Sequence, residues 1–100
     1  MLTHNITTKV HPDIHEKWTA FHLGVRLPTL RTLAFINDVK LFHLLNQNED
    51  EGMTYVMQIY FTGPSEYETF LKLLPQLRLE ENTLWPDRFV SFETVMETVH

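Results

Sequence analysis

The stretch from residue 53 to residue 61 constrains the fold more than any other part of the chain. Its alternation is typical of a strand with large side chains on both faces. One face would carry Tyr55, Met57, Ile59 and Phe61, and the opposite face would carry Val56, Gln58 and Tyr60. A strand with two apolar faces lies inside a sheet and needs cover above and below. The rest of the chain must therefore provide cover for both sides of a sheet.

Three further strands are predicted over residues 2–10, 39–45 and 88–99, where apolar and β-branched residues alternate. Residues 46–52 between the second strand and the central one are polar and mostly acidic, which is typical of a solvated hairpin tip. The last strand again has large side chains on both faces, with Phe89 and Val95 opposite Val90, Phe92 and Met96.

The first predicted helix begins at residues 11–13, where a proline and an aspartate suit a helix start. Its buried stripe would consist of Ile14, Trp18, Phe21 and Val25. A short helical connector is expected within residues 26–37, although Pro28 disfavours helix at Leu27.

The second predicted helix begins at a capping box formed by Ser65 and Glu68, and Pro75 is expected to kink it. Helical spacing predicts a buried face made of Tyr67, Phe70, Leu71 and Leu74. The acidic residues are expected on the exterior as solvated charge: Glu66, Glu68, Glu80 and Glu81.

The predicted order is β-α-β-β-α-β, which is the split pattern of a ferredoxin-like α+β domain covering residues 1–100. Right-handed crossovers place both helices on one face of a four-stranded antiparallel sheet. The other face would carry five large apolar or aromatic side chains, namely Phe42, Leu44, Val56, Tyr60 and Phe92. A patch of this size is unusual on a monomer, so we expect a two-fold homodimer joined through this face.

Composition excludes several classes of function. A formal net charge of −5 with only eight scattered Lys and Arg residues argues against nucleic-acid binding. The absence of cysteine excludes disulfides and thiolate chemistry and fits a reducing compartment. No stretch is long and apolar enough to span a membrane, and no secretion signal is recognisable, so a cytoplasmic protein is expected.

Motifs along nearly the whole chain resemble a bacterial family known as domain of unknown function 4286. The matching residues are Asn5-Ile6-Thr7, Ile14-His15-Glu16-Lys17-Trp18, Leu27-Pro28, Phe35, Thr54-Tyr55-Val56, Gln58, Tyr60, Leu77-Arg78, Asp87-Arg88-Phe89-Val90-Ser91-Phe92 and Thr94. The chain departs from the family pattern at His4, Arg26 and Leu33, where an aromatic residue, a histidine and a glycine are usual. The resemblance implies a dimeric α/β-barrel fold and no assigned activity.

Four polar residues are predicted on the dimer face: Asn5, Thr7, Gln58 and Tyr60. Buried amides and hydroxyls need partners, so these groups can fix the register of two joined sheets. The alternative is a small cavity between the sheets that binds an unidentified small molecule. Catalysis there would need a titratable group, and the predicted faces direct both His4 and His43 toward the helices instead.

His11 and His15 are spaced to chelate a metal if both are helical, with Asp13 or Glu16 as a further ligand. We favour a polar border beside Trp18 over a metal site, because His11 precedes a proline and suits a cap. No catalytic triad or glycine-rich phosphate loop is present.

The sequence therefore favours a self-associating domain without enzymatic activity, cofactor or metal. The alternative is a small cofactor-free enzyme of the monooxygenase-like barrel class, or a ligand sensor, that uses a cavity between the sheets of a dimer.

Overall fold

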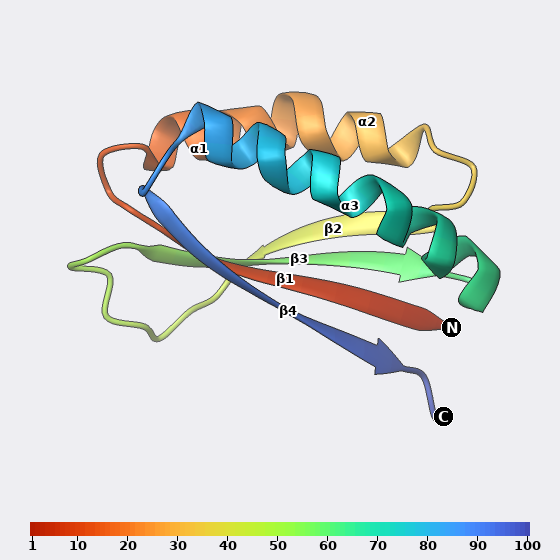
Figure 1. The fold of residues 1–100 in the computed structure, drawn as a ribbon. Helices are drawn as coiled ribbons and strands as arrows, with labels where there is room; N and C mark the ends of the chain where they lie inside the picture. Colours follow the sequence, from red (N-terminus) through yellow and green to blue (C-terminus); the bar gives the residue numbers. More distant parts are fainter.

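The computed structural model describes residues 1–100 and has two layers, a four-stranded sheet and a layer of helices on one of its faces (Figure 1). The elements are β1 (Leu2–Val10), α1 (His15–Phe21), the π-helix η1 (His22–Arg26), α2 (Leu27–Arg31), β2 (Asp38–His43), β3 (Met53–Phe61), α3 (Pro64–Leu84) and β4 (Phe89–Glu97). The strand order is β2-β3-β1-β4, and all neighbours are antiparallel. The predicted ferredoxin-like order is confirmed.

The alternation along β3 divides its side chains between the two faces as the sequence predicts. Ile59 pairs with His4 of β1 and Val39 of β2, and all three lie under the helices. The core under the helices also contains Met57, Phe61, Leu27, Leu30, Ile36, Phe70 and Leu74. Each large side chain buried here stabilises the fold by roughly 1.5–3 kcal/mol.

The helical segment between β1 and β2 differs from the prediction at both of its ends. The helix begins at His15, after a turn, and it continues through a π-helical segment into α2. Pro28 has no N–H, so it cannot donate the regular helical bond to the carbonyl of Gly24. The Leu27 N–H bonds the carbonyl of His22, five residues earlier, which is the spacing of a π-helix. The wider turn buries His22 and leaves Val25 51% exposed, so the predicted stripe is wrong at Val25.

The long helix α3 begins two residues earlier than a capping box at Ser65 would require. Gly63 is the extended N-cap residue and Pro64 is the first helical residue, so Ser65 already lies inside the first turn. The Ser65 hydroxyl donates to Glu66 Oε2, and the predicted capping box is wrong. The helix runs through Pro75 without interruption to Leu84. Phe70 and Leu74 are buried as predicted, but Leu71 is 41% exposed.

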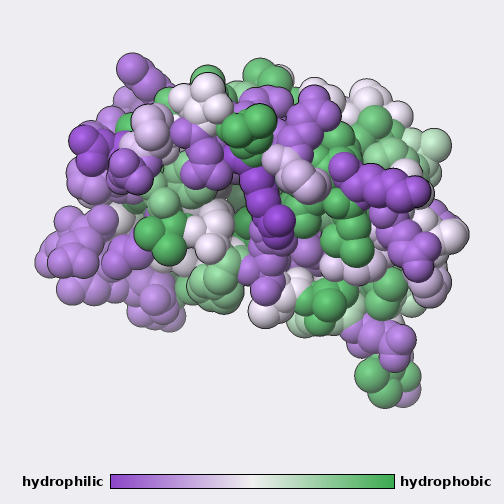
Figure 2. Space-filling view, in the orientation of Figure 1, coloured by the Kyte–Doolittle hydropathy of each residue, from purple (hydrophilic) through white to green (hydrophobic).

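No helix covers the second face of the sheet, which is the lower face in Figure 1. Polar side chains gather at the end of the molecule that holds the loop between β2 and β3, while apolar and polar side chains are mixed over the side formed by α3 and β4 (Figure 2). None of the helices has the length and apolar character that a membrane span requires.

Candidate functional site

The four predicted polar residues lie together on the open face of the sheet. Asn5 is opposite Gln58 on β3 and opposite Thr94 on β4, and its amide nitrogen donates to Thr94 Oγ1 at 3.3 Å. The Tyr60 hydroxyl donates to Gln58 Oε1 at 2.5 Å. The buried oxygen Oδ1 of Asn5 has no hydrogen-bond partner. The strand register therefore brings these polar groups into the middle of the open face.

Apolar side chains border this polar group. Phe42 is opposite Val56, and Thr7 lies between Val56 and Phe92 in the register of the sheet. Phe92 is 62% exposed. Leu44 lies just beyond the end of β2, and its N–H still donates to the Thr54 carbonyl at 2.9 Å. The open face is therefore apolar at both sides and polar at its centre.

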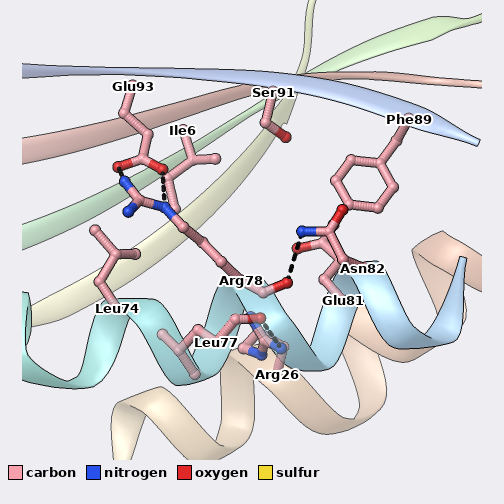
Figure 3. Close-up of a pocket in the computed structure, with 10 residues that line it drawn as sticks. All are labelled: Ile6, Arg26, Leu74, Leu77, Arg78, Glu81, Asn82, Phe89, Ser91 and Glu93. Atoms are coloured by element: carbon pink, nitrogen blue, oxygen red, sulfur yellow. Dashed lines mark hydrogen bonds and ion pairs between the residues drawn. The ribbon is translucent and has the colours of Figure 1, made fainter. Parts of the chain in front are cut away.

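A cavity of about 230 Å³ lies on the opposite side of the sheet, between α3 and strands β1 and β4 (Figure 3). We call it the α3 cavity. Its apolar wall consists of Ile6, Leu74, Leu77 and Phe89. Glu81 and Arg26 border both this cavity and a second, smaller one of about 20 Å³, which has room for about one water molecule.

Glu81 is a largely buried carboxylate on the wall of the α3 cavity. Its Oε2 atom accepts a hydrogen bond from Trp18 Nε1 at 2.7 Å and lies 3.3 Å from His22 Nε2. Burial acts to raise the pKa of Glu81, but the hydrogen bonds and charges of His22, Trp18 and Arg26 outweigh it and hold the pKa below its ordinary value. Glu81 is therefore an ionised group beneath the helix.

Glu93 of β4 connects the sheet to α3 at the edge of the α3 cavity. Arg78 reaches across from α3 and donates to both carboxylate oxygens, with Nε 2.8 Å from Oε2 (Figure 3). His4 Nε2 lies 3.0 Å from Oε1 of the same carboxylate. Burial raises the pKa of Glu93, but the hydrogen bonds from Arg78 and His4 and the charge of Arg78 lower it by a larger amount, so the net shift is downward.

His4 is buried between β1 and α3. Because Nε2 faces an ionised carboxylate, it carries the proton, and Nδ1 then accepts from the Tyr67 hydroxyl at 2.9 Å. Burial lowers the pKa of His4, and this effect is larger than the opposing effect of Glu93. Burial and the charge of Glu93 both raise the pKa of Tyr67. These residues form a polar cluster with an uncharged imidazole at neutral pH.

Arg26 lies at the base of the α3 cavity and is also buried. Its Nη2 atom is 3.4 Å from the Leu77 carbonyl and 3.4 Å from Glu80 Oε1, and its guanidinium lies over the Phe21 ring at 5.2 Å. The π-helical turn places both Arg26 and His22 on the side that faces α3. Widened turns of this kind are frequent at functional sites.

Sequence reasoning missed this cavity and placed Glu81 on the exterior of the helix. A signal was present, because Leu74, Leu77 and Glu81 are spaced to share one helix face. A second signal was the spacing of four residues from Trp18 to His22 and from His22 to Arg26. The distance of 59 residues between His22 and Glu81 hides their contact from local patterns.

The histidines that might have bound a metal have other partners. His11 Nδ1 lies 2.6 Å from Asp13 Oδ1, and His15 Nε2 lies 2.5 Å from the Tyr55 hydroxyl. His43 also stacks with Tyr55, and its Nε2 atom lies 2.8 Å from Glu49 Oε2. No three side chains of metal-ligating type are grouped to hold an ion.

The sheet order, the helices on one face and the open opposite face define a ferredoxin-like α+β domain. Residues 1–99 match the family described as "Domain of unknown function (DUF4286)", and the chain belongs to that family. The family has no assigned function. No curated protein matches the chain.

Solved structures with the same fold have low sequence identity to this chain. HapK from Hahella chejuensis superposes with a TM-score of 0.70 at 14% identity, over 99% of this chain and 93% of that chain. An ethyl tert-butyl ether D family protein from Bacillus halodurans gives 0.67 at 9% identity, over 98% and 100%. A dimeric ferredoxin-like protein from an uncultured marine organism gives 0.66 at 12% identity, over 99% and 96%. These similarities concern the fold alone.

Proposed function

We propose that the chain is a self-associating binding domain without enzymatic activity, which works as a homodimer joined through the open face of the sheet. The observation that carries this proposal is the exposure of large apolar side chains on a sheet face that no helix covers. Phe92 and Val90 on β4 are 62% and 73% exposed, and Phe42 and Met96 on the same face are also exposed.

A second copy of the chain is the partner that fits this face best. Two-fold pairing covers the same patch on both copies with a single self-complementary contact. Burying each large side chain would contribute roughly 1.5–3 kcal/mol, and a standard interface covers about 800 Å² per partner. The polar residues Asn5, Gln58 and Tyr60 at the centre would set the register of the two sheets. A structural neighbour is described as a dimeric ferredoxin-like protein, which supports a dimer of this fold.

Light scattering of the purified chain at micromolar concentration tests the proposal, and the expected mass is twice 11.9 kDa. Phe92→Glu should produce a monomer, because the new carboxylate would be buried without a partner in the interface. Leu79→Glu is the matched control, since Leu79 is 68% exposed on α3 and lies away from the open face. A monomeric wild-type chain would overturn the proposal.

A second candidate function follows from the polar groups at the centre of the open face. Tyr60, Gln58 and Asn5 would line any cavity left between the two sheets, as a small cofactor-free enzyme or a ligand sensor would need. A crystal structure of the dimer separates the candidates. A junction filled by side chains supports the binding domain, and an open pocket of roughly 300 Å³ or more supports the enzyme or sensor. We keep the cytoplasm as the proposed location, since a chain without cysteine suits a reducing compartment.

A further inference from the structure

The charged groups around the α3 cavity are unevenly paired. Two guanidinium groups each have a carboxylate partner, because Arg78 bonds Glu93 on both oxygens and Arg26 contacts Glu80 at 3.4 Å. Glu81 is the other carboxylate that lines the cavity, and its hydrogen-bond partners are an indole and an imidazole. The cavity wall therefore has one largely buried carboxylate that no guanidinium group bonds directly, although the charge of Arg26 helps to lower its pKa.

His22 holds the Glu81 carboxylate in place. Its Nε2 atom already faces Glu81 Oε2, while its Nδ1 atom is buried and has no hydrogen-bond partner. The single polar contact of the ring is therefore the one to Glu81, and it fixes the carboxylate through Oε2.

Two hydrogen-bond acceptors beside each other on the helix wall of the cavity have no partner. Both hydrogen bonds to Glu81 end on Oε2, which leaves Oε1 free. Asn82 uses its amide nitrogen on the Arg78 carbonyl at 2.9 Å, which leaves its side-chain oxygen free. A ligand that donates hydrogen bonds and carries a positive charge matches these two groups.

The size and apolar wall of the cavity limit the rest of the ligand. An apolar cavity of about 150 Å³ holds one benzene molecule, and the α3 cavity measures about 230 Å³. A benzene-sized ring with a short side chain therefore fits this volume. Ile6, Leu74, Leu77 and Phe89 provide apolar contacts for such a ring.

We propose that the α3 cavity binds a small amphipathic amine, whose ammonium group is held by the Glu81 carboxylate while its ring lies against the apolar wall. Trp18 and His22 act as positioning residues that fix the Glu81 side chain through Oε2 and leave Oε1 for the ligand. An anionic ligand of the same size would meet the charge of Glu81 and bind poorly. This site lies on the opposite side of the sheet from the proposed dimer face, so it does not depend on self-association.

Isothermal titration calorimetry at pH 7 with three probes of matched size tests the ligand class. Phenethylamine should bind the wild-type chain, and 2-phenylethanol and phenylacetate should bind at least about tenfold more weakly, a difference of about 1.4 kcal/mol. Glu81→Gln should lower the affinity for phenethylamine at least about tenfold and leave that for 2-phenylethanol unchanged. Glu68→Gln is the matched control, because it removes an exposed carboxylate of the same helix that does not line the cavity.

Equal affinity for all three probes, a preference for phenylacetate, or no binding of phenethylamine would each overturn the proposal. If Glu81→Gln fails to give a cooperative thermal transition, nitrogen-15 chemical-shift mapping on the wild-type chain takes its place. Phenethylamine should then shift the amide signals of Ile6, Ser91 and residues 81–82. Shifts confined to the open face of the sheet would place the ligand elsewhere and refute the site.

Discussion

His4 and Glu93 meet beneath α3, with Nε2 of the histidine 3.0 Å from Oε1 of the carboxylate, although their Cα atoms are not direct partners in the sheet. The contact is diagonal, because His4 is opposite Val95 and Glu93 is opposite Ile6. Burial nevertheless dominates at His4 and lowers its pKa. The histidine therefore makes the stability of the fold depend on pH.

We expect the free energy of unfolding to decrease as the pH falls below about 6.5. Unfolded His4 takes up a proton near its ordinary pKa of 6.5, whereas the folded histidine has a lower pKa, so acid favours the unfolded chain. The contribution is fully present above pH 6.5 and is lost through the window between 6.5 and the lowered pKa. Urea unfolding measured at several pH values between 8 and 5 gives the free energy of unfolding as a function of pH. This free energy should change less with pH for His4→Gln than for wild type. An equal change in both would contradict a lowered pKa for His4.

Arg78→Met should weaken the connection between α3 and β4. The free energy of unfolding should fall by about 1 kcal/mol, because the lost hydrogen bonds are charge-assisted but the Arg78 side chain is half-exposed to solvent. The pKa of Glu93 should rise, since Arg78 is the strongest of the groups that lower it. Carbon-13 NMR titration of the Glu93 carboxyl measures this shift, and an unchanged pKa would refute the pairing.

Phe70→Ala should destabilise the fold by about 3–5 kcal/mol, the usual cost of removing a large aromatic side chain from a packed core. Phe70 is fully buried and packs on Phe61, with ring centroids 5.1 Å apart. Leu71→Ala is the matched control on the next residue, which is 41% exposed, and its effect should be below about 1 kcal/mol. Chemical denaturation monitored by circular dichroism compares the free energies of unfolding of the two variants. Similar decreases would show that the buried face of α3 is assigned incorrectly.

Gly52→Ala should destabilise the start of β3 by at least about 1 kcal/mol. Gly52 has a φ angle of 151°, and a Cβ atom there would lie 2.6 Å from the Val10 carbonyl oxygen. Gly24→Ala is the contrasting variant, because an added Cβ at Gly24 meets nothing within 4 Å and alanine favours helix. Thermal unfolding should therefore show a lower midpoint for the first variant and an equal or higher midpoint for the second.

The strands and their faces were predictable because a period of two residues is a local property. Val56 and Tyr60 lie on the open face, and Ile59 and Phe61 lie under the helices, as alternation requires. Phe92 and Phe42 were assigned to the open face for the same reason. The architecture then follows from the order of the elements.

The α3 cavity was not predictable in the same way, because its polar groups meet through tertiary contacts. Trp18 and Glu81 are 63 residues apart, and so are His4 and Tyr67. A regular helical period also assigned Val25 to the core, whereas the π-helical turn exposes it and buries Arg26. Hydrophobic patterns alone do not indicate that a helix changes its period in this way.

The wide turn at residues 22–26 has a consequence for the tolerance of the chain to deletions. A π-helical turn accommodates one residue more than the regular helix would at the same place, and an α-helix rotates by about 100° per residue. Deleting Gly24 would remove the extra residue, so the helix would return to its ordinary period and Trp18 would keep its direction relative to α2. The indole would still face Glu81. A deletion of one residue in this turn should thus be less damaging than a deletion within α1, which would rotate one part of the helix by about 100° relative to the other.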